Sequence, residues 1–199
     1  MPQGYAAILA DPPWLERGGG QCKRGADRHY PLLATIDIPR VIMASGFWSP
    51  ANDAHLYLWA TNNFLPDGLW VMSQLGFRYV TNVCWVKDRA GLGQYFRGKH
   101  ELLLFGVRGR GFGAKTDARD IDSVLDDESC YGAPRGEHSA KPHLFHELVE
   151  RRSRGPYLEL FARSQRDGWT SWGTDIRARM AEPGPSCVVP RVEAQETTR

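Results

Sequence analysis

Apolar side chains concentrate in short runs along this 199-residue chain, and each run has the length of a β-strand. The main runs cover residues 5–10, 55–60, 79–86, 101–107 and 157–162, and a weaker one covers 169–172. Several of them are apolar almost without interruption, which is typical of parallel strands that are buried on both faces.

Helices are expected between these strands, at about 37–45, 65–75 and 142–153. In the last segment Leu144, Leu148 and Val149 form an apolar stripe, and Gly155-Pro156 follows as a stop signal. Alternation of strands and helices predicts an α/β sheet, whose ligands bind beyond the carboxyl ends of the strands.

Composition agrees with a globular protein, since 42% of the residues are hydrophobic and 24% are charged. We expect one domain over residues 1–178 and a disordered tail over 179–199, where the periodicity disappears. The net charge is only +2, so binding to nucleic acid has to depend on local basic segments. Residues 17–28 and 108–119 are basic and glycine-rich, and they are equally compatible with plain solvated linkers.

The four cysteines are scattered, with no pair at the spacing of a zinc site. That pattern also disfavours a disulfide framework and fits a reducing compartment. No apolar stretch has the length of a membrane span, and the first residues lack the features of a signal peptide. We therefore expect a cytoplasmic protein that needs no metal and does not contact a membrane.

The first apolar run leads directly into Asp11-Pro12-Pro13-Trp14. Proline has a fixed φ angle and no N–H, so the Pro12 carbonyl is held in one direction beside the Asp11 carboxylate. Two acceptors and a flat ring at the end of a strand suit a planar group that carries an amine, such as an unpaired adenine. The alternative is a proline turn followed by a tryptophan of the core.

Further motifs follow in a fixed order along the chain. They are His29-Tyr30-Pro31, Leu56-Tyr57-Leu58-Trp59-Ala60-Thr61, Cys84-Trp85-Val86-Lys87, His100-Glu101-Leu102-Leu103, His138-Ser139-Ala140-Lys141-Pro142, Glu159-Leu160-Phe161-Ala162-Arg163 and Gly168-Trp169-Thr170-Ser171-Trp172-Gly173. Together with Asp11-Pro12-Pro13-Trp14, this series resembles the DPPW family of adenine N6-methyltransferases over residues 5 to about 175. That family includes the catalytic subunit that methylates adenosine in eukaryotic mRNA. The short chain is similar to the compact bacterial or phage branch, which implies DNA as the substrate.

The resemblance implies S-adenosylmethionine as the cofactor and a Rossmann-like methyltransferase sheet with permuted, β-class motif order. Asp11 and the Pro12 carbonyl would hold the target amine, and Pro13 and Trp14 would complete the catalytic motif, with the Trp14 ring against the base. The implied substrate residues are His29, Tyr30 and Lys87, and the implied cofactor residues are Lys99, His100, Glu159, Phe161, Arg163, Gln165 and Thr174. Between Lys99 and His100 the register favours His100, and Lys141 stands at a family position near the pocket without an assigned role.

Three other readings remain open. The same chemistry can act on RNA, or the chain can be a catalytically silent partner that only shapes a groove for nucleic acid. Methylation of cytosine N4 is disfavoured, because relatives with that activity usually have serine in place of Asp11. The sequence contains no separate target-recognition domain, so specificity would come from the loops 15–30, 88–99 and 108–136, or from a homodimer or a partner subunit.

Overall fold

The computed structural model describes residues 4–15, 32–91, 95–126, 141 and 144–173. Within these ranges, seven strands form one sheet in the order β5-β3-β4-β2-β1-β6-β7. The strands are β1 (Tyr5–Ala10), β2 (Pro50–Ala60), β3 (Arg78–Val86), β4 (His100–Arg108), β5 (Val124–Asp126), β6 (Tyr157–Leu160) and β7 (Trp169–Trp172). The helices are α1 (Asp37–Ala44), α2 (Leu65–Gln74) and α3 (Leu144–Arg152), with a short 3-10 turn η2 (Asn62–Phe64) before α2.

Most of the sheet is parallel. β1 pairs in parallel with β2 and β6, β6 with β7, and β3 with β5, whereas β4 runs antiparallel to both β2 and β3. The expected α/β class is therefore confirmed, and β4 is the one reversed strand among those described.

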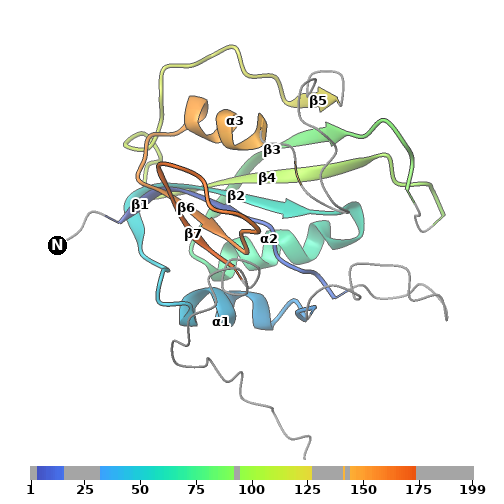
Figure 1. The fold of residues 1–199 in the computed structure, drawn as a ribbon, viewed down its shortest axis with the longest axis horizontal. Helices are drawn as coiled ribbons and strands as arrows, with labels where there is room; N and C mark the ends of the chain where they lie inside the picture. The colour runs from blue at the N-terminus through green and yellow to red at the C-terminus, as the bar shows by residue number, and fades with distance from the viewer. Residues whose placement is uncertain (1–3, 16–31, 92–94, 127–140, 142–143, 174–199) are drawn as a thin grey trace, which may run out of the picture.

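Helices cover both faces of this sheet, as Figure 1 shows, with α3 on one face and α1 and α2 on the other. The two faces correspond to two apolar clusters, because neighbouring residues of a strand point to opposite sides. In β1, Ile8 and Ala10 pack in the cluster of α1 and α2, while Ala7 and Leu9 pack in the cluster of α3. Burial on both faces explains why the sequence reads as continuous apolar runs.

The predicted elements agree with the observed ones to within one or two residues at most ends. β2 is longer than expected because it begins at Pro50, and β6 ends at Leu160, two residues early. η2 and β5 were not predicted. The expected tail over 179–199 lies outside the described residues.

Candidate active site

Asp11 lies at the carboxyl end of β1, where the order of the strands reverses. β2 lies on one side of β1, and β6 followed by β7 lies on the other. Parallel strands that lead away to opposite sides leave a crevice between their carboxyl ends, and α/β sheets bind ligands there. The Asp11 backbone N–H donates to the carbonyl of Leu160 at 3.3 Å, so this residue still joins β1 to β6 at the crevice.

Hydrogen bonds hold the two prolines that follow Asp11. The backbone N–H of Trp14 donates to the Pro12 carbonyl at 3.0 Å, and the N–H of Leu33 donates to the Pro13 carbonyl at 2.8 Å. A carbonyl oxygen has two lone pairs, so the Pro12 carbonyl can accept a second hydrogen bond from a ligand. The turn is rigid because fixed φ angles and these bonds act together.

The Trp14 side chain belongs to the core of the described structure. Only 8% of the residue is exposed, and its ring stacks on Phe64 at a centroid distance of 5.3 Å. Its indole N–H donates to the carbonyl of Trp59 at 3.0 Å. A base beside Asp11 would therefore meet at most an edge of this ring, and Trp14 fixes the position of the turn.

The ammonium group of Lys141 donates hydrogen bonds to both carboxylate oxygens of Asp11. Its Nζ lies 3.0 Å from Oδ1 and 2.9 Å from Oδ2 of Asp11, and 3.3 Å from Oε2 of Glu101. The same ammonium lies 5.0 Å from the centre of the Trp59 ring, which adds a cation–π contact. One buried cation thus connects the ends of β1, β2 and β4.

Glu101 extends this cluster to the second lysine. Its Oε1 accepts a hydrogen bond from Lys87, whose ammonium lies 5.1 Å from the centre of the Trp85 ring. The cluster holds two carboxylates and two ammonium groups, so its net charge is zero. His100 precedes Glu101 in β4 and points to the other face of the sheet, away from Lys141, and Lys99 is exposed.

Mutual attraction outweighs burial at two members of the cluster, Lys141 and Glu101. Burial by itself would lower the pKa of Lys141, but Asp11 and Glu101 outweigh burial and raise that pKa above its ordinary value of 10.5. Burial by itself would raise the pKa of Glu101, but Lys141 and Lys87 outweigh it and lower that pKa below 4.5. At neutral pH both groups are charged.

Four of the residues expected to contact the cofactor lie at or just beyond the adjoining end of β6. Glu159 faces α3, where its Oε2 is 3.0 Å from Nε2 of His146. Phe161 follows β6 with a φ of +63°, which is rare for a bulky residue. Strained backbone of this kind is concentrated at ligand sites. Arg163 is half-buried and Gln165 is exposed just beyond this turn.

The turn after β6 also approaches the end of β7 very closely. The Ala162 N–H donates to the carbonyl of Trp172 at 2.9 Å. A Cβ on Gly173 would lie 2.0 Å from the Ala162 carbonyl oxygen, so only glycine fits at this position. The carboxyl ends of β6 and β7 therefore form one tight unit beside Asp11.

The structure brings together some of the expected residues and not others. Asp11 and Lys87 belong to one charged cluster through Lys141 and Glu101, and Pro12 follows Asp11 in the chain. Glu159 and Phe161 lie at the adjoining end of β6, whereas His29, Tyr30 and Thr174 lie outside the described residues. Sequence reasoning gave no role to Glu101 or Lys141. A signal existed for Glu101, because an acid inside an otherwise apolar strand needs a buried partner.

Two further expectations concern the rest of the chain. In the described ranges, no group of three His, Cys, Asp or Glu side chains could hold a metal ion, and no helix is long and apolar enough to cross a membrane. The basic segment 108–119 follows β4 at its carboxyl end, which adjoins Ala54 in the first half of β2, and so lies away from Asp11.

Comparison with known proteins identifies relatives of this chain among the methyltransferases. The MT-A70 family model matches residues 5–175. The chain is 26% identical over 191 residues to the type II methyltransferase M.MunI of Mycoplasma sp, covering 86% of this chain and 78% of that protein. It is 29% identical to the N6-methyladenosine RNA methyltransferase MTA1 of Pyricularia oryzae and 26% identical to human N(6)-adenine-specific methyltransferase METTL4. Each of these matches covers 86% of this chain, but only 47% and 37% of the two relatives.

Proposed function

The chain belongs to the MT-A70 family, and on that premise we propose that it transfers a methyl group from S-adenosylmethionine to the N6 amine of adenine in DNA. The family and its named relatives make it an enzyme of the adenine N6-methyltransferase type with a nucleic-acid substrate. The observation that carries the proposal is the Asp11 carboxylate, which is held by Lys141 at the crevice between β1 and β6.

We propose that the crevice holds S-adenosylmethionine, a cofactor with a sugar and a charged amino-acid part. Phe161 has strained backbone there, and Gly173 allows the ends of β6 and β7 to lie in direct contact. Glu159, Phe161 and Arg163 would hold the ribose side, and Gln165, Thr174, Lys99 and His100 remain proposed contacts. When bound, S-adenosylmethionine supplies an electrophilic methyl group on a sulfonium sulfur.

Asp11 and the Pro12 carbonyl would act on the amine. The lone pair of the adenine N6 is conjugated into the ring, which makes this nitrogen a poor nucleophile. Acceptors on its two N–H bonds favour a tetrahedral nitrogen and stabilise the positive charge that develops as the N–C bond forms and the S–C bond breaks. The proton released from the methylated nitrogen passes to Asp11 or to water.

Lys141 and Glu101 would position Asp11. A carboxylate has about four acceptor sites, so two hydrogen bonds from one ammonium leave acceptors for an amine. The Lys141 ammonium fixes the rotamer of Asp11, and Glu101 with Lys87 fixes the ammonium. Such pre-organisation reduces the reorganisation that the reaction requires.

The target adenine has to leave a duplex before it can enter this crevice. We propose His29, Tyr30 and Lys87 as residues of the acceptor side, with Trp14 bordering the base. Lys87 already contacts Glu101, which puts its ammonium within the same cluster as Asp11.

DNA is our first candidate because the resemblance to the compact branch implies it, and the match over 78% of the type II methyltransferase M.MunI agrees with that branch. RNA is the second candidate, since MTA1 is named as an RNA methyltransferase and shares 29% identity with this chain. A silent partner subunit is disfavoured by the intact Asp11–Lys141 pair, which such a protein would not require.

The test is methyl transfer from labelled S-adenosylmethionine to matched DNA and RNA pools, followed by nucleoside digestion. We expect N6-methyladenine in the DNA pool, and none with Asp11→Asn, whereas Asp37→Asn on α1 should behave as the wild type. Product in the RNA pool alone would replace the DNA proposal, and absence of product in both pools would contradict the enzyme proposal.

A further inference from the structure

A second hollow lies at the opposite end of the sheet from Asp11, and we call it the distal pocket. Its volume is about 260 Å³, and it is lined by Phe112, Lys115, Thr116, Asp117, Arg119 and Arg154. The segment that contains most of these residues follows β4, on the side of the molecule where β1 begins (Figure 1).

The backbone that forms the distal pocket is tied to the end of α3. The Thr116 N–H donates to the carbonyl of Arg152 at 3.1 Å, and the Arg154 N–H donates to the carbonyl of Ala114 at 2.8 Å. Ala114 is fully buried. The lining side chains therefore project from a fixed frame, although they are exposed.

A buried polar network holds together the two segments that form the distal pocket. The ring of His55 lies 2.6 Å from the Ser153 hydroxyl through Nδ1, and its Nε2 lies 2.9 Å from the Gly111 carbonyl. Because a carbonyl can only accept, Nε2 carries the proton and Nδ1 accepts from the Ser153 hydroxyl. Tyr57 donates in turn to the Ser153 oxygen at 2.6 Å. Every member has a partner, so the network fixes both sides of the distal pocket at once.

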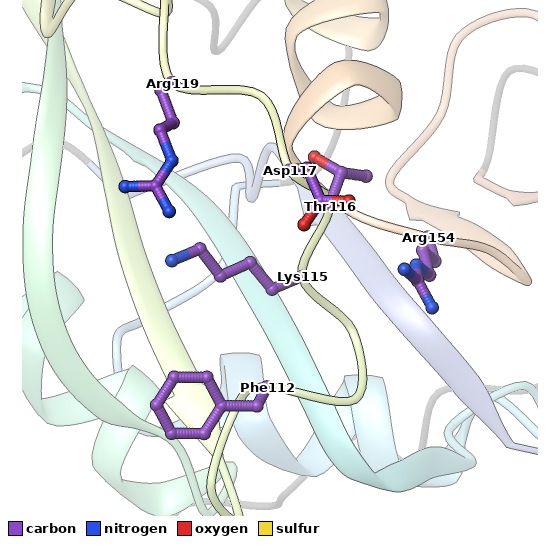
Figure 2. Close-up of a pocket in the computed structure, with 6 residues that line it drawn as sticks. All are labelled: Phe112, Lys115, Thr116, Asp117, Arg119 and Arg154. Atoms are coloured by element: carbon purple, nitrogen blue, oxygen red, sulfur yellow. The ribbon is translucent and has the colours of Figure 1, made fainter.

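The charge of the distal pocket is positive. Lys115, Arg119 and Arg154 form no ion pair with any carboxylate of the described residues. Asp120, the acid just beyond Arg119, is instead bound by Arg151 at 2.7 Å. Figure 2 shows the Lys115 ammonium, the Arg119 guanidinium and the Phe112 ring on the same side of the loop, with Lys115 between the other two.

Phe112 adds an aromatic surface that the core does not use, since 74% of this residue is exposed. Unpaired cations attract phosphate groups, and an exposed ring beside them offers a stacking surface for a base. We propose that the distal pocket binds the backbone of the nucleic-acid substrate, with Lys115 and Arg119 on phosphates and Phe112 against an adjoining base or sugar. This inference rests on the proposed function, because it assigns a second contact to the same substrate.

The separation from Asp11 sets the length of nucleic acid that can reach both sites. In the β2–β4 pairing, Leu102 is opposite Ala60 and Arg108 is opposite Ala54, a distance of six residues along each strand. At a rise of ~3.3 Å per residue the two ends lie roughly 20 Å apart. A duplex rises 3.4 Å per base pair, so a flank of about six base pairs is the minimum for one molecule to contact both.

The test measures DNA binding by fluorescence anisotropy over a series of salt concentrations, without any readout of methylation. We compare the wild type with Lys115→Gln/Arg119→Gln, and with the control Arg40→Gln, which removes an exposed cation on α1. Each lost phosphate contact lowers the slope of log K against log salt by ~0.9, so the pocket variant should lose about 1.8 on a 30-base-pair duplex. A 10-base-pair hairpin with a central adenine has flanks below the minimum, and there the two variants should have equal slopes.

Equal slopes for the pocket variant, the control and the wild type on the long duplex would overturn the proposal. So would selective displacement of DNA from the wild type by inorganic phosphate at constant ionic strength, since that identifies a site for a small anion. If the slope changes as expected but no methyl transfer is detected, the distal pocket binds nucleic acid and the proposed enzymatic function is contradicted. Normal methyl transfer with unchanged slopes gives the reverse conclusion.

Discussion

Replacing Lys141 by methionine removes an ammonium that contacts both Asp11 and Glu101, and it keeps most of the side-chain volume. The lost contacts are those of 2.9, 3.0 and 3.3 Å to three carboxylate oxygens. The side chains of Lys141 and Glu101 are 13% exposed and that of Asp11 is 26% exposed, so water compensates only in part. Loss of one partner of a buried pair costs about 3 kcal/mol, because the other charge remains unpaired. In a domain of this size that corresponds to a decrease in Tm of roughly 6–12 °C.

The directions of the pKa shifts predict how the destabilisation by Lys141→Met changes with pH. In the wild type, the lowered pKa of Glu101 contributes stability that is present above pH 4.5 and is lost only as the pH falls through the still lower folded value. The raised pKa of Lys141 contributes stability that is present below pH 10.5 and is lost as the pH rises through the higher folded value. Between pH 5 and 8, Glu101 and Lys141 of the wild type therefore do not make the free energy of unfolding depend on pH. In Lys141→Met the Glu101 carboxylate keeps Lys87 but loses its other cation and protonates more readily, so the destabilisation should be smaller at pH 5 than at pH 8.

Urea unfolding of the wild type, Lys141→Met, Asp11→Asn and the double variant measures the coupling between the two side chains. Lys141→Met should cost at least 1 kcal/mol less in the Asp11→Asn background, because the unpaired carboxylate is then absent. Lys99→Met is the control, and this exposed lysine should change the unfolding free energy by less than about 0.5 kcal/mol. An equal cost of Lys141→Met in both backgrounds, together with no dependence on pH, would refute the ion-pair account.

Two other predictions concern the packing around the two sites. Gly173→Ala would place a Cβ 2.0 Å from the Ala162 carbonyl oxygen, so we expect a cost of about 3 kcal/mol in urea unfolding and weaker binding of S-adenosylmethionine by calorimetry. Gly91→Ala, whose Cβ would meet its nearest atom at 3.6 Å, should change neither quantity. Burial holds the pKa of His55 below its ordinary 6.5, so the unfolded chain binds an extra proton as the pH falls below 6.5 and stability decreases. The fall in Tm between pH 7.5 and 5.5 should be shallower in His55→Gln than in the wild type, and equal slopes would contradict the neutral buried histidine.

Local patterns predicted the parallel core of the sheet because its strands are buried on both faces. They missed β5, since the three residues Val124–Asp126 are too short to produce a pattern. They also placed the end of β6 two residues too late, because Phe161 is apolar but has a left-handed backbone. The reversal of β4 follows from its hairpin connection to β3, which hydrophobicity alone does not reveal.

The candidate site was predictable where one short segment contains the functional groups, as in Asp11-Pro12-Pro13-Trp14. It was not predictable where distant segments meet. The partners of Asp11 stand 90 and 130 residues further along the chain, at Glu101 and Lys141, and only the folded sheet brings them together. Trp14 shows a different limit of sequence analysis. From the sequence its ring could contact a base or pack in the core, and the structure shows that it is buried in the core.

The most direct measurement compares turnover and cofactor affinity in Asp11→Asn, an isosteric change that removes the charge. If Asp11 stabilises charge that develops on the adenine amine, the turnover number should fall by ~100-fold or more, while the dissociation constant for S-adenosylmethionine stays within about twofold of the wild type. Single-turnover methyl transfer and isothermal titration calorimetry give the two quantities. Turnover close to that of the wild type, or a loss that follows entirely from weaker cofactor binding, would contradict the role assigned to Asp11.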